Sequence, residues 1–268
     1  MSFYNQKVVL ITGGNGVLGS SIANHFSSLG AKIGILGRTE STVQKTVDNL
    51  NNKGGTAIAL IADVLNRNDL EKACKKLLSK WEKIDILINA AGGNLKEATI
   101  MPDDSFFDMS EDAFSKVMHL NLLGTVLPSQ VFGKYLIKEG NSCILNISSM
   151  AAQLPLTGIV GYSASKAAID NFTKWLAVEL CSKYGKRIRV NAIAPGFFIS
   201  KQNKTLLLKR NGNLTDRGTT IISQTPMRRF GKPEELNGVV EWICSDAASF
   251  VTGIVVPIDG GFSAFSGV

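Results

Sequence analysis

The chain of 268 residues contains few of the side chains that build metal centres or covalent crosslinks. Its cysteines lie far apart and form no C-x-x-C pair, and its two histidines belong to no H-E-x-x-H motif or cluster with cysteines and carboxylates. The cysteines are Cys74, Cys143, Cys181 and Cys244, and the histidines are His25 and His119. We therefore expect no disulfide framework, no zinc site and no metal- or histidine-based mechanism.

Long apolar runs are also missing. The longest, such as Lys7 to Thr12 and Ile84 to Ala91, fall far short of the roughly 18 residues that a membrane span requires. The first residues show no basic segment followed by an apolar core and a cleavage site. We expect a protein of the cytoplasm with no membrane span.

The composition is that of a compact globular protein. Apolar residues make up 44% of the chain, charged residues 19%, and the mean hydropathy is +0.11. These values exclude disorder, collagen and coiled coil. A chain of this length buries roughly three quarters of its unfolded surface. Because no low-complexity linker or repeat divides it, we expect a single domain over residues 1–268.

The net charge of +7 is concentrated in one stretch, between Lys201 and Arg229, where seven basic residues face one acid, Asp216. The basic residues are Lys201, Lys204, Lys209, Arg210, Arg217, Arg228 and Arg229. A local excess of this kind fits an anionic small substrate or cofactor at least as well as a nucleic acid, and a solvated surface is the simplest alternative. We expect a small anionic partner and no nucleic acid.

Continuous apolar strands alternate with amphipathic helices along the chain. This rhythm predicts an α/β fold, a single Rossmann-type doubly wound parallel sheet with helices on both faces. Residues 197–231, rich in Lys, Asn and Gly, interrupt the rhythm. We name residues 197–231 the lid segment and expect it to cover a substrate. The expected strands are Val8–Thr12, Lys32–Leu36, Ala57–Ala62, Ile84–Asn89, Cys143–Ser148, Ile188–Ala194 and Ile254–Ile258. The main expected helices are Val17–Leu29, Glu40–Asn51, Asn68–Trp81, Ser110–Lys138 and Tyr162–Tyr184.

A glycine-rich turn follows the first expected strand. Residues 14–19 match G-x-G-x-x-G and open the first expected helix, which is the context of a dinucleotide site. Glycines let the backbone approach a pyrophosphate, whose negative charge the exposed amides of a helix start stabilise. The candidate cofactor-binding residues of this turn are Gly13, Asn15, Gly16, Val17, Leu18 and Gly19.

Five short stretches together resemble the classical short-chain dehydrogenase/reductase family, and they span essentially the whole chain. They are Thr12-Gly13 with the glycines that follow, Asn89-Ala90-Ala91-Gly92, Ser149, Tyr162-Ser163-Ala164-Ser165-Lys166 and Pro195-Gly196. The family usually writes T-G-x-x-x-G-x-G, whereas here Gly16 comes one place early and Val17 stands where the middle glycine is usual. The resemblance implies an NAD(P)-dependent enzyme acting on a CH–OH group, and we expect the altered turn to keep its cofactor.

Tyr162 and Lys166 are four residues apart on an expected helix, so they leave the same helical face. An ammonium near a phenol favours the phenolate and moves its pKa toward the working range. We expect Tyr162 to be the general acid/base and Lys166 its electrostatic partner. The resemblance adds that Lys166 binds the nicotinamide ribose.

The resemblance implies two further catalytic residues. Ser149 precedes Tyr162 by thirteen residues, which is the family's spacing, and its hydroxyl would stabilise charge on a substrate carbonyl. Ser148 is the rival serine. Asn121 matches the family asparagine that supports a proton relay to the active-site lysine. The alternative role for Asn121 is closure of a local helix distortion.

The remaining candidate residues for cofactor binding lie at or just after the ends of expected strands. After the second strand, Gly37 and Arg38 stand where an NAD-preferring site usually has a carboxylate, so we favour NADP(H), with NAD(H) as the alternative. The resemblance places adenine, nicotinamide and ribose near several further residues. The other expected cofactor-binding residues are Thr39, Asp63, Val64, Asn89, Ala90, Gly92, Tyr162, Lys166, Pro195 and Gly196.

Longer stretches resemble a narrower group within the family, the D-mannonate oxidoreductases (fructuronate reductases). Four stretches carry this resemblance: Ala90–Asn94, Asn121–Thr125, Ala194–Phe198 and Asp259–Val268. The implied substrate is a sugar acid, D-fructuronate or D-mannonate, with Asn94, Lys96, Ser149 and Gln153 as candidate substrate residues. The alternatives are reduction of a gluconate-type or 3-oxoacyl substrate, and a non-catalytic dinucleotide-binding regulator. The family further implies a homotetramer joined through the helices Ser110–Lys138 and Tyr162–Tyr184.

Overall fold

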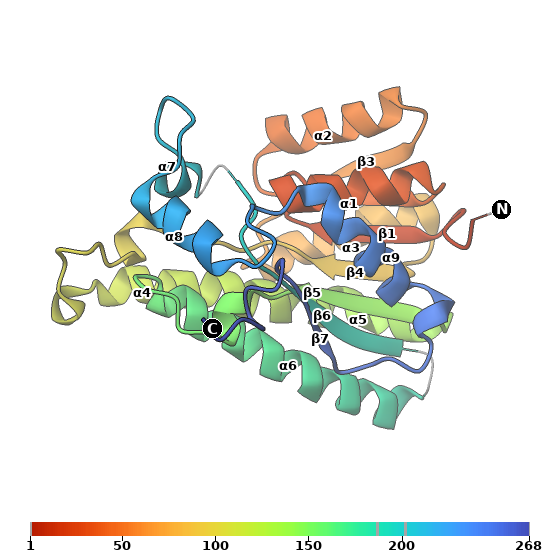
Figure 1. Cartoon of the computed structure of the whole chain (residues 1–268). Coiled ribbons are helices and arrows are strands. Elements are labelled where there is room, and N and C mark those ends of the chain that lie inside the picture. The colour runs from red at the N-terminus through yellow and green to blue at the C-terminus, as the bar shows by residue number, and fades with distance from the viewer. Residues whose placement is uncertain (1, 186–187, 201–202, 268) are drawn as a thin grey trace.

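The computed structural model describes residues 2–185, 188–200 and 203–267 and contains one seven-stranded parallel sheet. The strand order is β3-β2-β1-β4-β5-β6-β7, which confirms the expected doubly wound α/β fold (Figure 1). The strands are β1 (Val8–Thr12), β2 (Lys32–Gly37), β3 (Thr56–Ile61), β4 (Ile86–Asn89), β5 (Ser142–Ile147), β6 (Ile188–Pro195) and β7 (Val255–Ile258).

The order of the strands along the sheet reverses at β1, which pairs with β2 on one side and with β4 on the other. Thr12, the last residue of β1, lies opposite Leu36 of β2 and Asn89 of β4. The chain therefore leaves neighbouring strands toward opposite faces here, and parallel α/β sheets bind ligands in the crevice that results. The glycine-rich turn and the loop after β4 both lie at this switch point.

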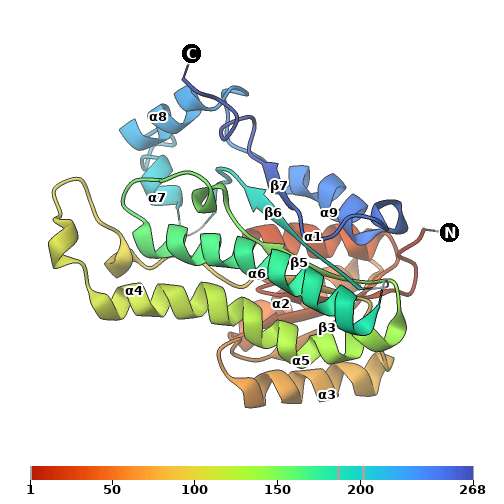
Figure 2. The same cartoon turned by 90° about the horizontal axis from the view of Figure 1, so that it is seen from below.

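Helices cover both faces of the sheet, as Figures 1 and 2 show. On one face α1, α2 and α9 contribute to a single apolar cluster, and on the other face α3, α5 and α6 contribute to a second one. The bounds of these helices are α1 (Val17–Ser28), α2 (Glu40–Asn52), α3 (Arg67–Trp81), α5 (Gly124–Glu139), α6 (Val160–Tyr184) and α9 (Asn237–Cys244).

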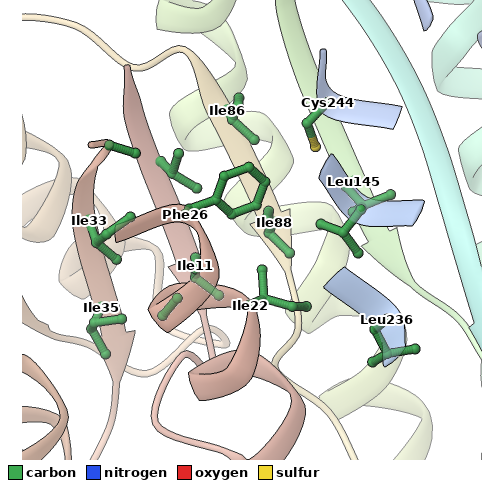
Figure 3. Close-up of a cluster of buried hydrophobic side chains, with 14 of the residues drawn as sticks. Ile11, Ile22, Phe26, Ile33, Ile35, Ile86, Ile88, Leu145, Leu236 and Cys244 are labelled. Atoms are coloured by element: carbon green, nitrogen blue, oxygen red, sulfur yellow. The ribbon is translucent and has the colours of Figure 1, made fainter. Parts of the chain in front are cut away.

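Large apolar side chains fill the first of these layers (Figure 3). Phe26 and Ile22 of α1 pack over Ile11 of β1 and Ile88 of β4, and all four are fully buried. Full burial of one such side chain contributes roughly 1.5–3 kcal/mol, so this layer fixes α1 and its glycine-rich start on the sheet.

The helix expected over Ser110–Lys138 has a distortion in its middle. It consists of α4 (Glu111–Met118), a π-helical turn (His119–Leu123) and α5. A π-turn adds one residue and frees a backbone carbonyl, and such turns often occur at functional sites. The fully buried Asn121 lies inside this turn, and its Nδ2 donates to the carbonyl of Val117 at 2.9 Å.

The lid segment folds back on itself and carries two short helices, α7 (Lys204–Leu207) and α8 (Asp216–Gln224). Phe198 and Gly231 pair in a parallel bridge that joins the two ends of the segment. The C-terminal end of the chain runs beside α8 (Figure 2), and Phe262 stacks edge-on against Phe197 with ring centroids 5.1 Å apart. Among the described residues, no helix has the length and apolarity that crossing a membrane requires.

Candidate active site

The four glycines of the turn have different surroundings. Gly13 has φ +63°, and a Cβ on it would lie 2.8 Å from the Ala90 carbonyl oxygen. A Cβ on Gly14 would lie 3.0 Å from the Ile11 carbonyl oxygen, and a Cβ on Gly19 would lie 2.5 Å from the Gly13 carbonyl oxygen. A Cβ on Gly16 would approach only that same Gly13 oxygen, at 3.2 Å. Gly16 is therefore the least enclosed of the four.

The start of α1 is suited to an anion. Gly16 is its N-cap residue, no described side chain caps the helix, and its first turn contains no acidic residue. Helix N-termini of this kind attract phosphate through free amides and the helix dipole. Val17 begins the helix directly, so the departure from the family's glycine pattern leaves this feature intact.

Thr12 holds the loop after β4 next to the glycine-rich turn. Its hydroxyl accepts hydrogen bonds from the amides of Ala90 at 3.1 Å and Ala91 at 3.2 Å. Asn89 is buried at the end of β4 and donates to Ser129 at 3.0 Å and to Asn146 at 2.9 Å. These bonds fix the position of the chain that leads from Asn89 to Gly92.

Asn121 and Lys166 meet at this loop. Asn121 accepts from the amide of Gly93 at 2.9 Å and donates to the Gly93 carbonyl at 2.8 Å. A Cβ on Gly92 would lie 2.6 Å from Asn121 Oδ1 and 3.6 Å from Lys166 Nζ. Asn121 therefore does close the helix distortion, and the same amide also fixes the loop beside Lys166.

Ser149, Tyr162 and Lys166 come together at the carboxyl end of β5. Ser149 is buried two residues after the end of β5, and hydrogen bonding by its side chain lowers the pKa of the Tyr162 phenol. Lys166 Nζ donates to the carbonyl of Ile147 at 2.7 Å and lies 5.5 Å from the centroid of the Tyr162 ring. A hydroxyl, a phenol and a lysine thus lie within one small volume.

Burial determines the proton affinities of this group. It raises the pKa of Tyr162, an effect that the hydrogen bond with Ser149 partly offsets, and it lowers the pKa of Lys166 to about 8 against the attraction of Asp170. The expectation that Lys166 moves the pKa of Tyr162 toward the working range is therefore wrong, because the loss of hydration on burial raises that pKa.

The two adjacent serines have different partners. Ser148 is buried and donates to the carboxylate of Asp170, whereas Ser149 faces Tyr162. The Ser149 hydroxyl also accepts from the Ala151 amide at 3.1 Å, which fixes its oxygen at the start of a short 3₁₀ turn. This geometry favours Ser149 over its rival.

The far end of the expected cofactor site lies where β2 ends. Asn15 donates to Thr42 at 2.9 Å, and a Cβ on Gly37 would lie 2.7 Å from Asn15 Oδ1. Arg38 and Thr39 are exposed just beyond, and Arg38 forms no ion pair with any described residue. As far as the described residues show, the site presents a free cation and no carboxylate at this strand end.

Asp63 and Val64 follow β3 on the same edge of the sheet. Asp63 accepts from the amide of Leu65 at 2.9 Å, so the turn-capping role that sequence allowed is present. Val64 is buried, and a Cβ on Gly124 would lie 3.0 Å from its side chain. Gly124 begins α5, so Val64 lies against the start of that helix.

Pro195 and Gly196 end β6 against the last part of the chain. A Cβ on Gly196 would lie 2.7 Å from the Asp259 backbone, and the Asp259 carboxylate caps the amides of Gly261 at 2.9 Å and Ser263 at 2.8 Å. Contact between Gly196 and Asp259 fixes where the lid segment leaves the sheet.

The candidate substrate residues have unequal positions. Asn94 and Leu95 follow the loop fixed by Asn121, and Leu95 packs with Tyr162 around a small buried cluster. Lys96 is exposed. Gln153 lines a hollow of about 690 Å³ with Asp170 and Lys174, whose described walls include none of the predicted catalytic residues. The substrate roles of Lys96 and Gln153 stay predictions.

The basic residues of the lid segment also differ. Arg229 forms two hydrogen bonds with Glu235, at 2.6 and 2.7 Å, and Arg228 donates to the carbonyl of Ser223. Arg217 donates to the hydroxyl of Thr157 at 3.1 Å and to its carbonyl at 3.3 Å, on the loop between Ser149 and Tyr162. Lys204, Lys209 and Arg210 are exposed. Lys201 lies outside the described residues.

Comparison with known proteins shows the family to which this fold belongs. Residues 15–263 match the family model described as enoyl-(acyl carrier protein) reductase. A Bacillus subtilis protein named uncharacterized oxidoreductase UxuB is 47% identical, over 98% of this chain and 96% of its own. A Haemophilus influenzae protein with the provisional name D-mannonate oxidoreductase, crystallised with bound NAD, is 42% identical, has a TM-score of 0.93 and covers 100% of this chain and 98% of its own. A 3-oxoacyl-[acyl-carrier-protein] reductase of Thermotoga maritima is 33% identical over 95% of this chain and 97% of its own.

The chain therefore belongs to the short-chain dehydrogenase/reductase family and is an NAD(P)-dependent oxidoreductase.

Sequence reasoning missed three contributors to the site. Thr12 anchors the loop after β4, and Asp170 accepts a hydrogen bond from Ser148, next to the catalytic serine. Thr157 connects the loop between Ser149 and Tyr162 to Arg217. The threonine at the end of β1 and the aspartate one turn beyond Lys166 were visible signals, because Thr12 directly precedes Gly13 and Asp170 lies four residues after Lys166. Nothing local to Thr157 indicates a partner sixty residues away.

Proposed function

We propose that the protein transfers hydride reversibly between a nicotinamide dinucleotide and a sugar acid, with D-fructuronate and D-mannonate as the substrate pair. The observation that carries the proposal is the convergence of Ser149, Tyr162 and Lys166 beside the loop fixed by Asn121. The Haemophilus influenzae and Bacillus subtilis relatives support the choice of substrate and of oxidoreductase chemistry.

The cofactor fits the residues at the switch point of the sheet. The amides of α1 and the open face of Gly16 would hold its pyrophosphate, and Asp63, Val64 and Asn89 would line its two ends, with Ala90, Gly92, Pro195 and Gly196 beside the nicotinamide. Bound there, a nicotinamide dinucleotide supplies or accepts the hydride. Lys166, whose ammonium is fixed by the Ile147 carbonyl, would bind its ribose.

The chain's own residues handle the proton. Ser149, with its oxygen held by the Ala151 amide, donates a hydrogen bond to the substrate carbonyl and stabilises the charge that develops as hydride arrives. Tyr162 gives its proton to that oxygen, and its raised pKa keeps the phenol protonated before the reaction. Lys166 lies close enough to Tyr162 to stabilise the phenolate that forms.

We propose that Arg38 sets the cofactor preference. The relative that was crystallised with NAD gives no support to the NADP(H) expected from the sequence, and an arginine stacked on adenine leaves NAD acceptable. Arg38→Asp would repel a 2′-phosphate and accept from the ribose hydroxyls, so kcat/KM with NADP(H) should fall by at least tenfold relative to NAD(H). A ratio that does not change on substitution would remove Arg38 from the cofactor site.

A panel of uronates and aldonates, assayed with both cofactors, tests the function. Reduction of D-fructuronate should exceed that of ketogluconates, the keto forms of gluconate-type substrates, and of acetoacetyl-coenzyme A, a 3-oxoacyl thioester. Preferred turnover of the thioester would overturn the sugar-acid assignment and support the reductase class of the Thermotoga maritima relative.

A further inference from the structure

Among the described residues, three buried side-chain oxygens have no hydrogen-bond partner: Asn89 Oδ1, Asn94 Oδ1 and Ser163 Oγ. Asn94 is the one of the three that the sequence assigns to the substrate. The residue directly before Asn94, Gly93, is bonded through both its amide and its carbonyl to Asn121. The residue after it, Leu95, packs against the same small buried cluster as Tyr162. Asn94 therefore lies in the short segment between two of the residues assigned to catalysis.

The neighbouring bonds fix which way the Asn94 amide faces. Asn94 Nδ2 donates to Thr99 Oγ1 at 2.8 Å, and Thr99 Oγ1 donates to the carbonyl of Leu95 at 3.0 Å. A hydroxyl has one proton, so Thr99, having donated it to Leu95, can only accept from Asn94. The amide nitrogen must face Thr99, and Oδ1 must face away from it.

Thr99 itself belongs to a rigid part of the site. The next residue, Ile100, donates its amide to the carbonyl of Gly158 at 2.9 Å, on the loop that leads into Tyr162. Gly158 has φ +77°, and a Cβ on it would lie 2.6 Å from the Ile100 carbonyl oxygen, so the two loops are in close contact. The contact between Ile100 and Gly158 thus holds Thr99 in place, and Thr99 in turn fixes the orientation of the Asn94 amide.

An acceptor that is buried without a partner is unfavourable, and a bound donor removes that cost. We infer that Asn94 Oδ1 accepts a hydrogen bond from a substrate hydroxyl next to the reacting carbon and thereby selects hydroxylated carbonyl compounds. Thr99 is the positioning residue that keeps Oδ1 facing the ligand. This inference deepens the proposed function and rests on the assignment of the active site made there.

A hydrogen bond to Asn94 would distinguish the two substrate classes by the hydroxyl groups next to the carbonyl. In D-fructuronate both carbons next to the carbonyl bear hydroxyl groups, whereas the corresponding carbons of a 3-oxoacyl thioester bear none. A site that hydrogen-bonds a substrate hydroxyl discriminates strongly against an analogue without it, because the protein acceptor is then left unpaired. Asn94 would therefore reject an acyl thioester even where Ser149 and Tyr162 could act on its ketone.

The test compares kcat/KM for D-fructuronate with that for its two analogues that each lack one of the neighbouring hydroxyls. Wild type should prefer the full substrate over one analogue by roughly tenfold to a hundredfold, and Asn94→Leu should bring that ratio close to one. Thr99→Val should reduce the ratio and Thr99→Ser should restore it. Glu97→Gln, an exposed change in the same segment, is the matched control.

The outcomes separate the inference from the proposed function. If wild type reduces D-fructuronate and Asn94→Leu lowers kcat/KM equally for all three compounds, or for none, the role of Asn94 is overturned and the function stands. If wild type instead reduces a different hydroxylated carbonyl compound, the same comparison is made with that compound and its deoxy analogue, and only the substrate named above fails. Preference for acetoacetyl-coenzyme A overturns both. NADH binding, followed by fluorescence, shows that each variant is folded.

Discussion

At the scale of single residues, the site combines groups whose proton affinities are changed by burial. Lys166 has a pKa of about 8 in the folded protein and an ordinary value of 10.5. The unfolded chain therefore binds more protons at this position between these two pH values. Because stability rises with pH wherever the unfolded state holds the extra proton, Lys166 penalises folding less as the pH increases from 8 to 10.5.

We predict this change from urea unfolding. The free energy of unfolding of wild type, minus that of Lys166→Met, should increase as the pH rises from about 8 to 10.5, because the methionine has no charge to lose. Curves that stay parallel over this range would show that the ammonium is not desolvated in the folded protein.

Residue-level reasoning from sequence was strongest where spacing alone defines geometry. The four-residue interval between Tyr162 and Lys166 predicts one helical face, and the structure places both side chains together on α6. The pKa of Tyr162 was predicted in the wrong direction, because the extent of its burial depends on tertiary packing, such as its contact with the cluster that contains Val117, which spacing does not specify.

At the scale of elements, the lid segment supplies a cation that lies against the loop leading into the catalytic tyrosine. Arg217 at the start of α8 bonds Thr157, whereas Arg229 is already paired with Glu235. A substrate carboxylate bound beside Tyr162 would find Arg217 with further N–H donors available, since a guanidinium has five and two are used here.

We therefore predict that Arg217→Gln raises KM for D-fructuronate by at least tenfold and leaves NAD(H) affinity unchanged, because charge-assisted hydrogen bonds are roughly twice as strong as neutral ones. Steady-state kinetics with Arg210→Gln as the matched control checks this. An increase of equal size in both variants would assign the effect to the net charge of the segment.

Strands and most helices were predictable because buried parallel strands are continuous apolar runs. Hydrophobic periodicity over Ser110–Lys138 predicts one continuous helix and does not show the π-turn, because that turn depends on the Asn121 amide bonding both Val117 and Gly93. The contact of Thr157 with Arg217 was equally out of reach, because it joins segments sixty residues apart.

At the scale of the whole molecule, α6 leaves apolar side chains uncovered. Trp175 is 57% exposed and Val178 is 68% exposed, three residues apart on one helical face. An exposed apolar patch on a long helix often marks a protein–protein contact. We propose that this face joins copies of the chain, consistent with the expected homotetramer.

We predict that Trp175→Glu combined with Val178→Glu lowers the sedimenting mass at micromolar concentration, because burying two carboxylates in an apolar interface is costly. Lys75→Glu, on the exposed surface of α3, should leave the mass unchanged. A monomeric wild type would refute the assembly outright.

The account as a whole rests on Tyr162 as the proton donor of a dinucleotide-dependent reductase. The most direct test measures kcat for NADH-dependent reduction of D-fructuronate by wild type and Tyr162→Phe, together with NADH affinity. The account predicts a fall in kcat of at least roughly a hundredfold with NADH affinity nearly unchanged, as general acid catalysis requires. Turnover by Tyr162→Phe at the wild-type rate would contradict it.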